Sequence, residues 1–514
     1  MSTIDQKQAA ADNTIYANKE DSSNTPSVLA GEVSSRFDAA AAYLVEHAAE
    51  YSDYTDAEAR KVLWKIDLRI TVLLWVATIL AAVDKIVISN AALYGMKTDT
   101  GLVGQQYSWV GSIFYFGYLV AEFPANWLIQ KLPVGRFLSC TVIGWAAIVL
   151  LLGAAQNAAG LMVLRFIMGA LEAPLFPSCS ILTVMWYTKK EQPIRVTLWY
   201  SGLSSLFTGI VSYGIGHISN AGVATWRLLF LILGAASFLW GIVLFFYLPS
   251  SPLEARFLSD RERYIAIDRI KENMTGIENR EFKRYQVKEA FLDWKTWPLV
   301  IFSICINVPN GGLVTFAAQI VSGLGYGKLE TTLLGMPTGV FMTVSGLMVS
   351  IPAYYLRNCR CLLAGICCLV PLVCCVLIKE LPKDSSKGGL LACYYIFYFY
   401  WGPYPTVISL PMANVSGHTK KITVNALMFL AYCIGNIIAP QFFISSEAPG
   451  YKTGYNAILA CISIAIVSLA VYALGLKWEN KRRDRVEGTG VDMTAEISLD
   501  DLTDKEKRGF RYTY

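Results

Sequence analysis

Two side chains of opposite charge stand in one long apolar stretch of the chain, residues 161–187. Arg165 and Glu172 are seven residues apart, so on a helix they lie on one face, two turns apart. A charge at membrane depth costs about 2.5–3.5 kcal/mol, so such residues usually face a water-filled cavity or a partner. Because arginine binds anions and a carboxylate carries protons, the pair predicts a site that an anion and a proton use together. A structural ion pair between neighbouring helices is the alternative that stays open.

A second pair of charges, Asp84 and Lys85, lies in the apolar stretch 68–91. Two successive crossings separate it from Arg165, and a rise of about 1.5 Å per residue puts both sites in the outer half of the membrane. We therefore expect Asp84 and Arg165 to lie close together. When Asp84, Lys85, Arg165 and Glu172 are all ionised, their charges sum to zero. Protonation of Glu172 leaves a net charge of one positive unit, which favours binding of an anion. Arg165 and Lys85 are the expected anion ligands. Glu172 and Asp84 are the expected proton-coupling carboxylates.

The apolar stretches of the second half of the chain carry amides and phenols in place of charges. Four of these side chains are predicted to contact the substrate: Asn307, Asn310, Tyr398 and Asn425. The run CYYIFYFYW around Tyr398 suits stacking on a planar ligand. Two alternatives stay open, since membrane amides often only hold helices together and membrane aromatics often only pack or anchor the interface.

Long apolar helices must position these side chains. The chain has 514 residues, of which 54% are hydrophobic and 16% charged, where a soluble chain has about 25% charged residues. Since the charges gather at both ends and in one central block, the sequence predicts an all-α polytopic membrane protein. Twelve transmembrane helices are expected near 68–91, 107–129, 137–155, 161–187, 196–217, 227–248, 297–319, 333–356, 361–378, 389–412, 423–444 and 454–476.

A hydrophilic block divides the expected helices into two groups of six. The predicted parts are a largely disordered tail over 1–66, a six-helix half over 67–248, a linker over 249–295, a second six-helix half over 296–476 and a tail over 477–514. Residues 36–50 are expected to form a short amphipathic helix, and Ser259 is expected to cap a helix in the linker. Basic residues flank the helices on the side of both tails and the linker, so these parts are predicted to be cytosolic.

Composition also excludes several classes of function. The net charge of +5 comes from 44 basic and 39 acidic groups. Because the two numbers are nearly equal, the composition argues against a nucleic-acid partner. Most of the twelve cysteines lie inside the expected helices, where they act as small apolar residues. There is no HExxH or other hydrolytic pattern. We therefore expect no enzyme activity, no metal and no cofactor.

One stretch resembles a known family signature. This stretch reads Arg165-Phe166…Gly169…Glu172-Ala173…Phe176-Pro177. It resembles the fourth-helix signature of the anion:cation symporter family, which belongs to the major facilitator superfamily. Four further stretches resemble the fungal allantoate permease group of that family: 102–133, 185–202, 248–263 and 420–443. One departure concerns the first helix, where the family usually has Asp-Arg-x-Asn and this chain has Asp84-Lys85-Ile86-Val87. Lysine cannot reproduce the bidentate hydrogen bonds of arginine. This departure affects the expectation for the substrate and leaves the expectation for the fold unchanged.

The resemblance implies the major facilitator fold and proton-driven uptake of a small organic or sulfur-containing anion. It also implies that Arg165 binds the anion and that Glu172 couples the proton. The expected partners are the anion, protons and the lipid bilayer, and we expect a monomer in the plasma membrane. Export of a fungal secondary metabolite is the first alternative. A nutrient sensor without net transport is the second, and a membrane enzyme lacks any catalytic constellation.

Overall fold

The computed structural model describes residues 31–188, 191–199, 202–218, 222–271, 282–356, 358–381, 387–488, 502–507 and 510–514. Regular structure in these ranges is helical throughout. Of the tail over 1–66 that was predicted to be largely disordered, residues 1–30 lie outside these ranges. Residues 31–66 are mainly helical, and their first helix, Gly31–Tyr51, contains the short helix expected over 36–50. Nine helices in the described ranges are long and apolar enough to cross a membrane. Together with α6, the pair α10–α11 and the series α20–α22, they make up the twelve expected crossings.

The first half contains the helices of residues 67–248, preceded by two helices of the N-terminal segment. In chain order these are α2 (Gly31–Tyr51), α3 (Asp56–Ile66), η1 (Asp67–Thr71), α4 (Val72–Leu93), α5 (Met96–Asp99), α6 (Gln106–Lys131), α7 (Val134–Leu152), α8 (Ala158–Glu172), α9 (Leu175–Trp186), α10 (Gln192–Trp199), α11 (Ser204–Gly216) and α12 (Thr225–Tyr247). The linker contributes η2 (Pro252–Glu254), α13 (Asp260–Arg269) and α15 (Arg284–Leu292).

The second half contains the helices that follow the linker. They are α16 (Thr296–Gly323), α17 (Lys328–Leu334), α18 (Thr338–Tyr355), α19 (Arg360–Glu380), α20 (Lys387–Phe397), η3 (Tyr398–Trp401), α21 (Pro403–Ile408), α22 (Leu410–Asn414), α23 (His418–Ile438), η4 (Ala439–Phe442), η5 (Ser445–Glu447) and α24 (Lys452–Glu487). α24 continues well beyond residue 476, where the last crossing was expected to end.

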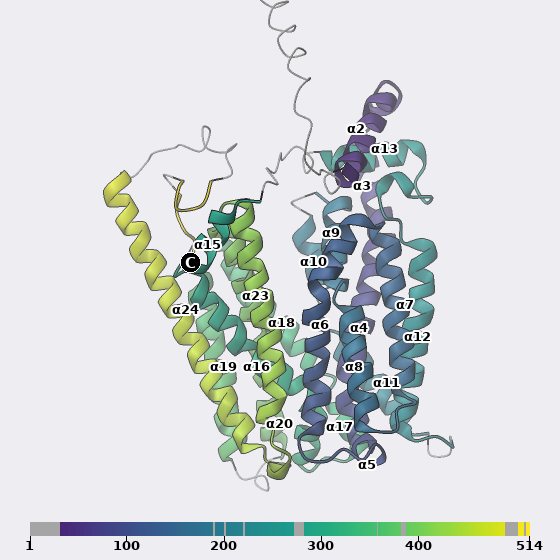
Figure 1. Cartoon of the computed structure of the whole chain (residues 1–514), viewed down its shortest axis with the longest axis vertical. Coiled ribbons are helices and arrows are strands. Elements are labelled where there is room, and N and C mark those ends of the chain that lie inside the picture. Colours follow the sequence, from purple (N-terminus) through teal and green to yellow (C-terminus); the bar gives the residue numbers. More distant parts are fainter. Residues whose placement is uncertain are drawn as a thin grey trace, which may run out of the picture.

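The two halves stand side by side as two bundles of roughly parallel and antiparallel helices (Figure 1). α2, α13 and α15 lie at one end of the bundles, at the top of Figure 1, and we call this the linker end. α5, α17 and the start of α20 lie at the opposite end, which we call the far end. The predicted cap of the linker helix is present, because Ser259 and Glu262 form a reciprocal capping box.

Local sequence explains how Glu172 is placed. Asn157 caps α8 by accepting a hydrogen bond from the amide of Gly160 at 2.8 Å. α8 ends at Glu172, and α9 begins three residues later, at Leu175, directly after Pro174. Since proline has no amide hydrogen to donate to the preceding turn, the crossing is broken there. Glu172 is therefore in the last turn of a helix that ends inside the membrane.

Close packing between α6 and α8 fixes the side chains that surround this break. A Cβ atom on Gly117 would lie 2.0 Å from the carbonyl oxygen of Phe166, and one on Gly169 would lie 2.0 Å from that of Phe114. No side chain fits at either position, so the two glycines allow the backbones to touch. This contact places Phe114 of α6 directly against the face of α8 that carries the charges.

Candidate substrate site

A cavity of about 200 Å³ lies between the two halves, and its lining extends from the middle of α16 to α17. The first half contributes side chains of α4, α6, α9, α10 and α11, and the second half those of α16, α17, α18, α20, η3 and α23. Among the described residues that line it, Lys85 is the one charged side chain. Polar and aromatic groups make up much of the remaining wall, including Asn90, Tyr115, Asn310, Tyr398, Tyr400, Trp401 and Tyr432.

Lys85 forms an ion pair with Glu172 at the wall of this cavity. Lys85 Nζ lies 2.8 Å from Glu172 Oε1, with 14% of the lysine side chain and 1% of the glutamate side chain exposed. The ammonium also lies over the rings of Phe114 and Tyr118, at 5.1 and 5.9 Å. Lys85 thus has its carboxylate partner on one side and the open cavity on the other. Protonation of Glu172 removes the negative charge that neutralises the lysine.

Arg165 does not line the cavity. It is 2% exposed, and its guanidinium lies 5.9 Å from the ring of Phe114 and 3.8 Å from the sulfur of Met168. No carboxylate in the described ranges forms an ion pair with it. Phe114, which stacks against both Lys85 and Arg165, lies close to each of the two cations.

Asp84 points away from the cavity although it is adjacent to Lys85 in the chain. Its Oδ2 accepts hydrogen bonds from Trp145 Nε1 at 3.2 Å and from Ser237 Oγ at 2.9 Å. These partners belong to α7 and α12, and the carboxyl is fully buried among them. Within the described residues Asp84 makes no ion pair with Arg165, so the contact expected between these two residues is not formed in this conformation.

The predicted ligands of the second half divide into two groups. Asn310 and Tyr398 line the cavity. The amide of Asn310 donates to Asn436 Oδ1 at 2.9 Å and its oxygen accepts from Tyr400 at 3.1 Å. Asn307 lies outside the cavity wall, where its amide donates to the carbonyl of Ser303 at 2.7 Å. Asn425 also lies outside it, with its amide 3.8 Å from the sulfur of Met412. These two side chains therefore link parts of the helical framework in this conformation.

Several cavity residues were not singled out from the sequence. Tyr400 and Trp401 follow Tyr398 in the same aromatic run, and this run was the available signal. Tyr115 of α6 and Tyr432 of α23 face each other from the two halves, with ring centroids 6.1 Å apart. Neither stands in a distinctive pattern, so only the packing of the two helices identifies them.

Hydrogen bonds join the two halves in the part of the bundles nearer the far end. Tyr107 of α6 donates to the carbonyl of Thr315 at 2.5 Å and accepts from Gln319 at 3.2 Å. Ser112 of the same helix donates to the carbonyl of Ile437 at 2.6 Å. The ammonium of Lys97 lies 4.0 Å from the ring centroid of Tyr107 and 5.6 Å from that of Phe316 in the second half. These contacts hold the halves together beside the part of the cavity that reaches toward the far end, where Val321, Thr331 and Thr332 line it.

Comparisons with known proteins agree with this architecture. Residues 74–440 match the family described as Major Facilitator Superfamily. An uncharacterized transporter of Schizosaccharomyces pombe is 38% identical, covering 90% of this chain and 88% of its own. The allantoate permease of Saccharomyces cerevisiae is 34% identical, covering 91% and 89%. Among solved structures, the inward-open xylose transporter XylE of E. coli has a TM-score of 0.59 at 12% identity, covering 78% of this chain and 95% of that one. This last similarity concerns the fold.

Proposed function

The chain belongs to the major facilitator superfamily and is a multi-pass membrane transporter, and we propose that it takes up a small organic or sulfur-containing anion together with a proton. The observation that carries the proposal is the ion pair of Lys85 and Glu172 at the cavity wall. The similarity to an allantoate permease supports an anionic substrate.

Competition for Lys85 couples the two ions in this proposal. While Glu172 is ionised, it neutralises Lys85, and the cavity has little attraction for an anion. When Glu172 takes up a proton, the charge of Lys85 becomes available to an anion in the cavity. A proton and a monovalent anion then cross together without net charge. Return of the empty protein requires Glu172 to lose its proton and pair with Lys85 again.

The proposal assigns different tasks to the remaining predicted site residues. Arg165 lies behind Phe114, and it supplies positive potential and meets the anion once the halves have moved. Asp84 is the second candidate for carrying the proton. Asn310 and Tyr398 provide a polar and an aromatic contact on the opposite wall.

The wall of the second half suits a flat substrate. Tyr398, Tyr400 and Trp401 come from one short segment, and Tyr432 adds a further ring from α23. Ring faces bind planar ligands through area and stacking. A carboxylate or sulfonate at Lys85, with a planar body toward these rings, fits both walls of the cavity.

We further propose that the linker end is cytosolic and that the protein works as a monomer in the plasma membrane. The excess of Lys and Arg beside the tails and the linker supports this orientation. With the far end outside, the contacts of Tyr107, Ser112 and Lys97 hold the halves together on the exterior side, which supports an inward-facing state.

Uptake by a yeast strain that lacks its own anion permeases tests the proposal. Radiolabelled carboxylates, sulfonates and sulfate are supplied at external pH 5 and pH 7, and surface protein is measured in parallel. We expect faster accumulation of one anion at pH 5 and none with Lys85→Gln. Lys379→Gln is a matched control, since this lysine lies outside the cavity wall and pairs with Glu380. Accumulation by Lys85→Gln at the wild-type rate contradicts the proposed site, and pH-stimulated efflux in place of uptake supports export.

A further inference from the structure

Each half carries a cap at the linker end, made of one linker helix and one terminal segment. On the first half, α13 is held by the N-terminal segment. Lys65 pairs with Glu262 at 2.7 Å, and Arg261 pairs with Glu58 at 3.1 Å. Tyr54 donates to Asp268 at 2.5 Å. The first part of the linker is thus attached to the first half.

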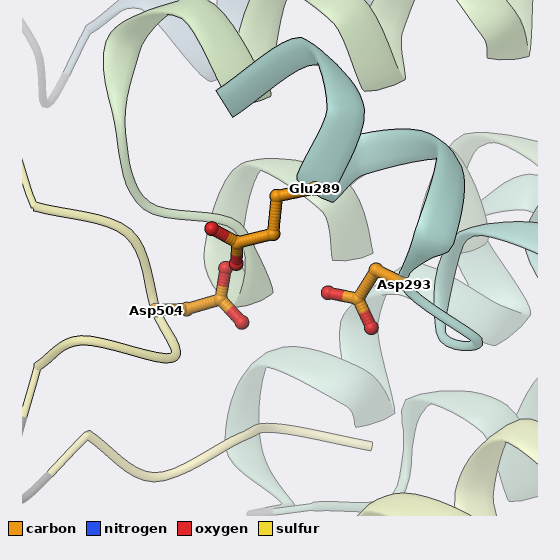
Figure 2. Close-up of side chains that lie close together, drawn as sticks. All are labelled: Glu289, Asp293 and Asp504. Atoms are coloured by element: carbon orange, nitrogen blue, oxygen red, sulfur yellow. The ribbon is translucent and has the colours of Figure 1, made fainter. Parts of the chain in front are cut away.

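On the second half, α15 is held around a buried lysine. Figure 2 shows that three carboxylates converge, those of Glu289 in α15, of Asp293 directly after that helix, and of Asp504 in the C-terminal segment. The ammonium of Lys420, at the start of α23, lies 2.8 Å from Glu289, 2.8 Å from Asp293 and 2.6 Å from Asp504. Lys295 also pairs with Asp504. Two ammonium groups therefore pair with this acidic cluster.

Residues 502–507 and 510–514 make further contacts with the ends of the second half's helices, and we call these two segments the strap. The hydroxyl of Tyr512 donates to Asp504 at 2.8 Å and accepts from Lys295 at 2.6 Å and from Arg483 at 2.9 Å. Asn480 of α24 pairs with the backbone of Tyr512 through two hydrogen bonds, of 2.8 and 2.9 Å.

A second such pair joins the strap to α22. Asn414 forms hydrogen bonds of 2.7 and 2.8 Å with the backbone of Thr513. Because Asn480 and Asn414 each satisfy one amide and one carbonyl of the strap, the strap backbone is fixed at two successive residues. The strap therefore has the contacts of an integral part of the second half.

The charge of Asp504 is stable over the physiological pH range. Burial by itself raises the pKa of this carboxyl, but Lys295 and Lys420 outweigh burial and lower the pKa to about 2. A carboxyl with a lowered pKa contributes its stabilisation fully above its unfolded pKa of about 3.9, and loses it as the pH falls toward 2. The strap is therefore expected to stay bound between pH 5 and pH 8.

We propose that the strap fixes α15 to the second half, so that the two linker helices move with opposite halves of the transporter. Only residues 270–283 then connect α13 to α15, and fourteen residues span at most about 50 Å. Major facilitator proteins transport by rocking one half against the other around the site. The strap thereby limits how far the halves separate at the linker end.

Limited trypsin digestion of the purified full-length protein in detergent tests the strap, and it requires no knowledge of the substrate. Cleavage after Lys283 and Arg284 reports release of α15, and cleavage after Lys505 and Lys507 reports release of the strap. With Asp504→Asn, both cleavages should accelerate at least about tenfold, because the two buried lysines lose a shared carboxylate.

Asp484→Asn is the matched control. This aspartate pairs with Arg511 of the strap at 2.8 Å, but the side chains are 42% and 31% exposed, so the pair contributes little. The same charge is removed from the same surface, and we expect cleavage rates within about twofold of wild type.

Tyr512→Phe is the second variant, and it decides the question if Asp504→Asn fails to give a single folded species on size exclusion. It removes one hydroxyl with three buried partners and keeps the ring, and it should accelerate both cleavages about fivefold. Wild-type cleavage rates in the folded variants overturn the proposal. Fast cleavage of the strap with unchanged cleavage at α15 also overturns it, since the strap then does not fix the helix.

Discussion

Replacement of Glu172 by glutamine should separate substrate binding from proton coupling. Glutamine has nearly the size of glutamate and permanently resembles its protonated form. In the structure Glu172 Oε1 lies 2.8 Å from Lys85 Nζ, and Lys85 lines the cavity. The variant therefore keeps the shape of the site and leaves the lysine charge available to an anion at every pH.

The expected change in affinity follows from the contact that the anion gains. A hydrogen bond to a charged group contributes about 1.5–3 kcal/mol, which corresponds to about ten- to a hundredfold tighter binding. In the wild type this gain is available only to the molecules in which Glu172 is protonated. We therefore expect the variant to bind anion more tightly at pH 7, with little dependence on pH.

Transport against a gradient should be lost in the same variant, because no group at Lys85 can take up and release the proton. Exchange of labelled for unlabelled anion should continue, since it needs no return of the empty protein. The measurements are counterflow and uphill uptake in vesicles, each normalised to the amount of protein. Glu122→Gln is the control, because this membrane glutamate bonds to Asn126 and does not line the cavity.

Two results would refute this reasoning. Uphill accumulation by Glu172→Gln with the wild-type pH dependence would show that another carboxylate carries the proton, and Asp84 would be tested next. Poor folding of the variant, rescued by Lys85→Met in the double variant, would show that the ion pair is only structural.

Three further predictions concern the walls of the cavity and its closure. Arg165→Lys should reduce uptake about tenfold at equal surface level although the charge is kept, because lysine lacks the planar fork; wild-type uptake argues against a role for Arg165. Trp401→Ala should weaken binding of a planar anion by about 0.5–1.5 kcal/mol and spare a small non-planar anion, as measured by competition for uptake. Tyr107→Phe removes the hydroxyl that joins the halves near the far end. Because a hydrogen bond contributes about 1 kcal/mol, its loss should raise the outward-open population about fivefold. Labelling of a cysteine placed at Ser89 by an impermeant maleimide measures that population, and unchanged labelling contradicts the assigned closure.

The pattern of apolar stretches was sufficient to predict the helical membrane fold. Each crossing needs about 20 apolar residues, and this requirement is local, so it can be counted along the chain. The polar block between the sixth and seventh crossings and the cap at Ser259 are equally local signals. The presence of charges at membrane depth likewise pointed to the part of the chain for which we propose the site, because such charges are too costly to bury without a partner.

The identity of the charge that meets the cavity was decided by tertiary structure alone. Asp84 and Lys85 are neighbours in the chain, but successive residues of an α-helix point about 100° apart. One therefore faces α7 and α12 and the other faces the cavity. The sequence does not encode the rotation of α4 about its axis in any local pattern, since it results from packing against all neighbouring helices.

The same reason applies to Arg165 and to Asp504. The contact of Gly117 and Gly169 brings Phe114 against α8, so that Lys85 rather than Arg165 lines the cavity in this state. Asp504 lies in a polar segment whose composition resembles a solvated tail, and it becomes a buried ligand only because Lys295 and Lys420 approach from distant parts of the chain. The sequence by itself determined that there are helices, where they cross and which charges need partners. Only the tertiary structure decided which partners they have, because an ion pair depends on distances that the order of residues does not contain.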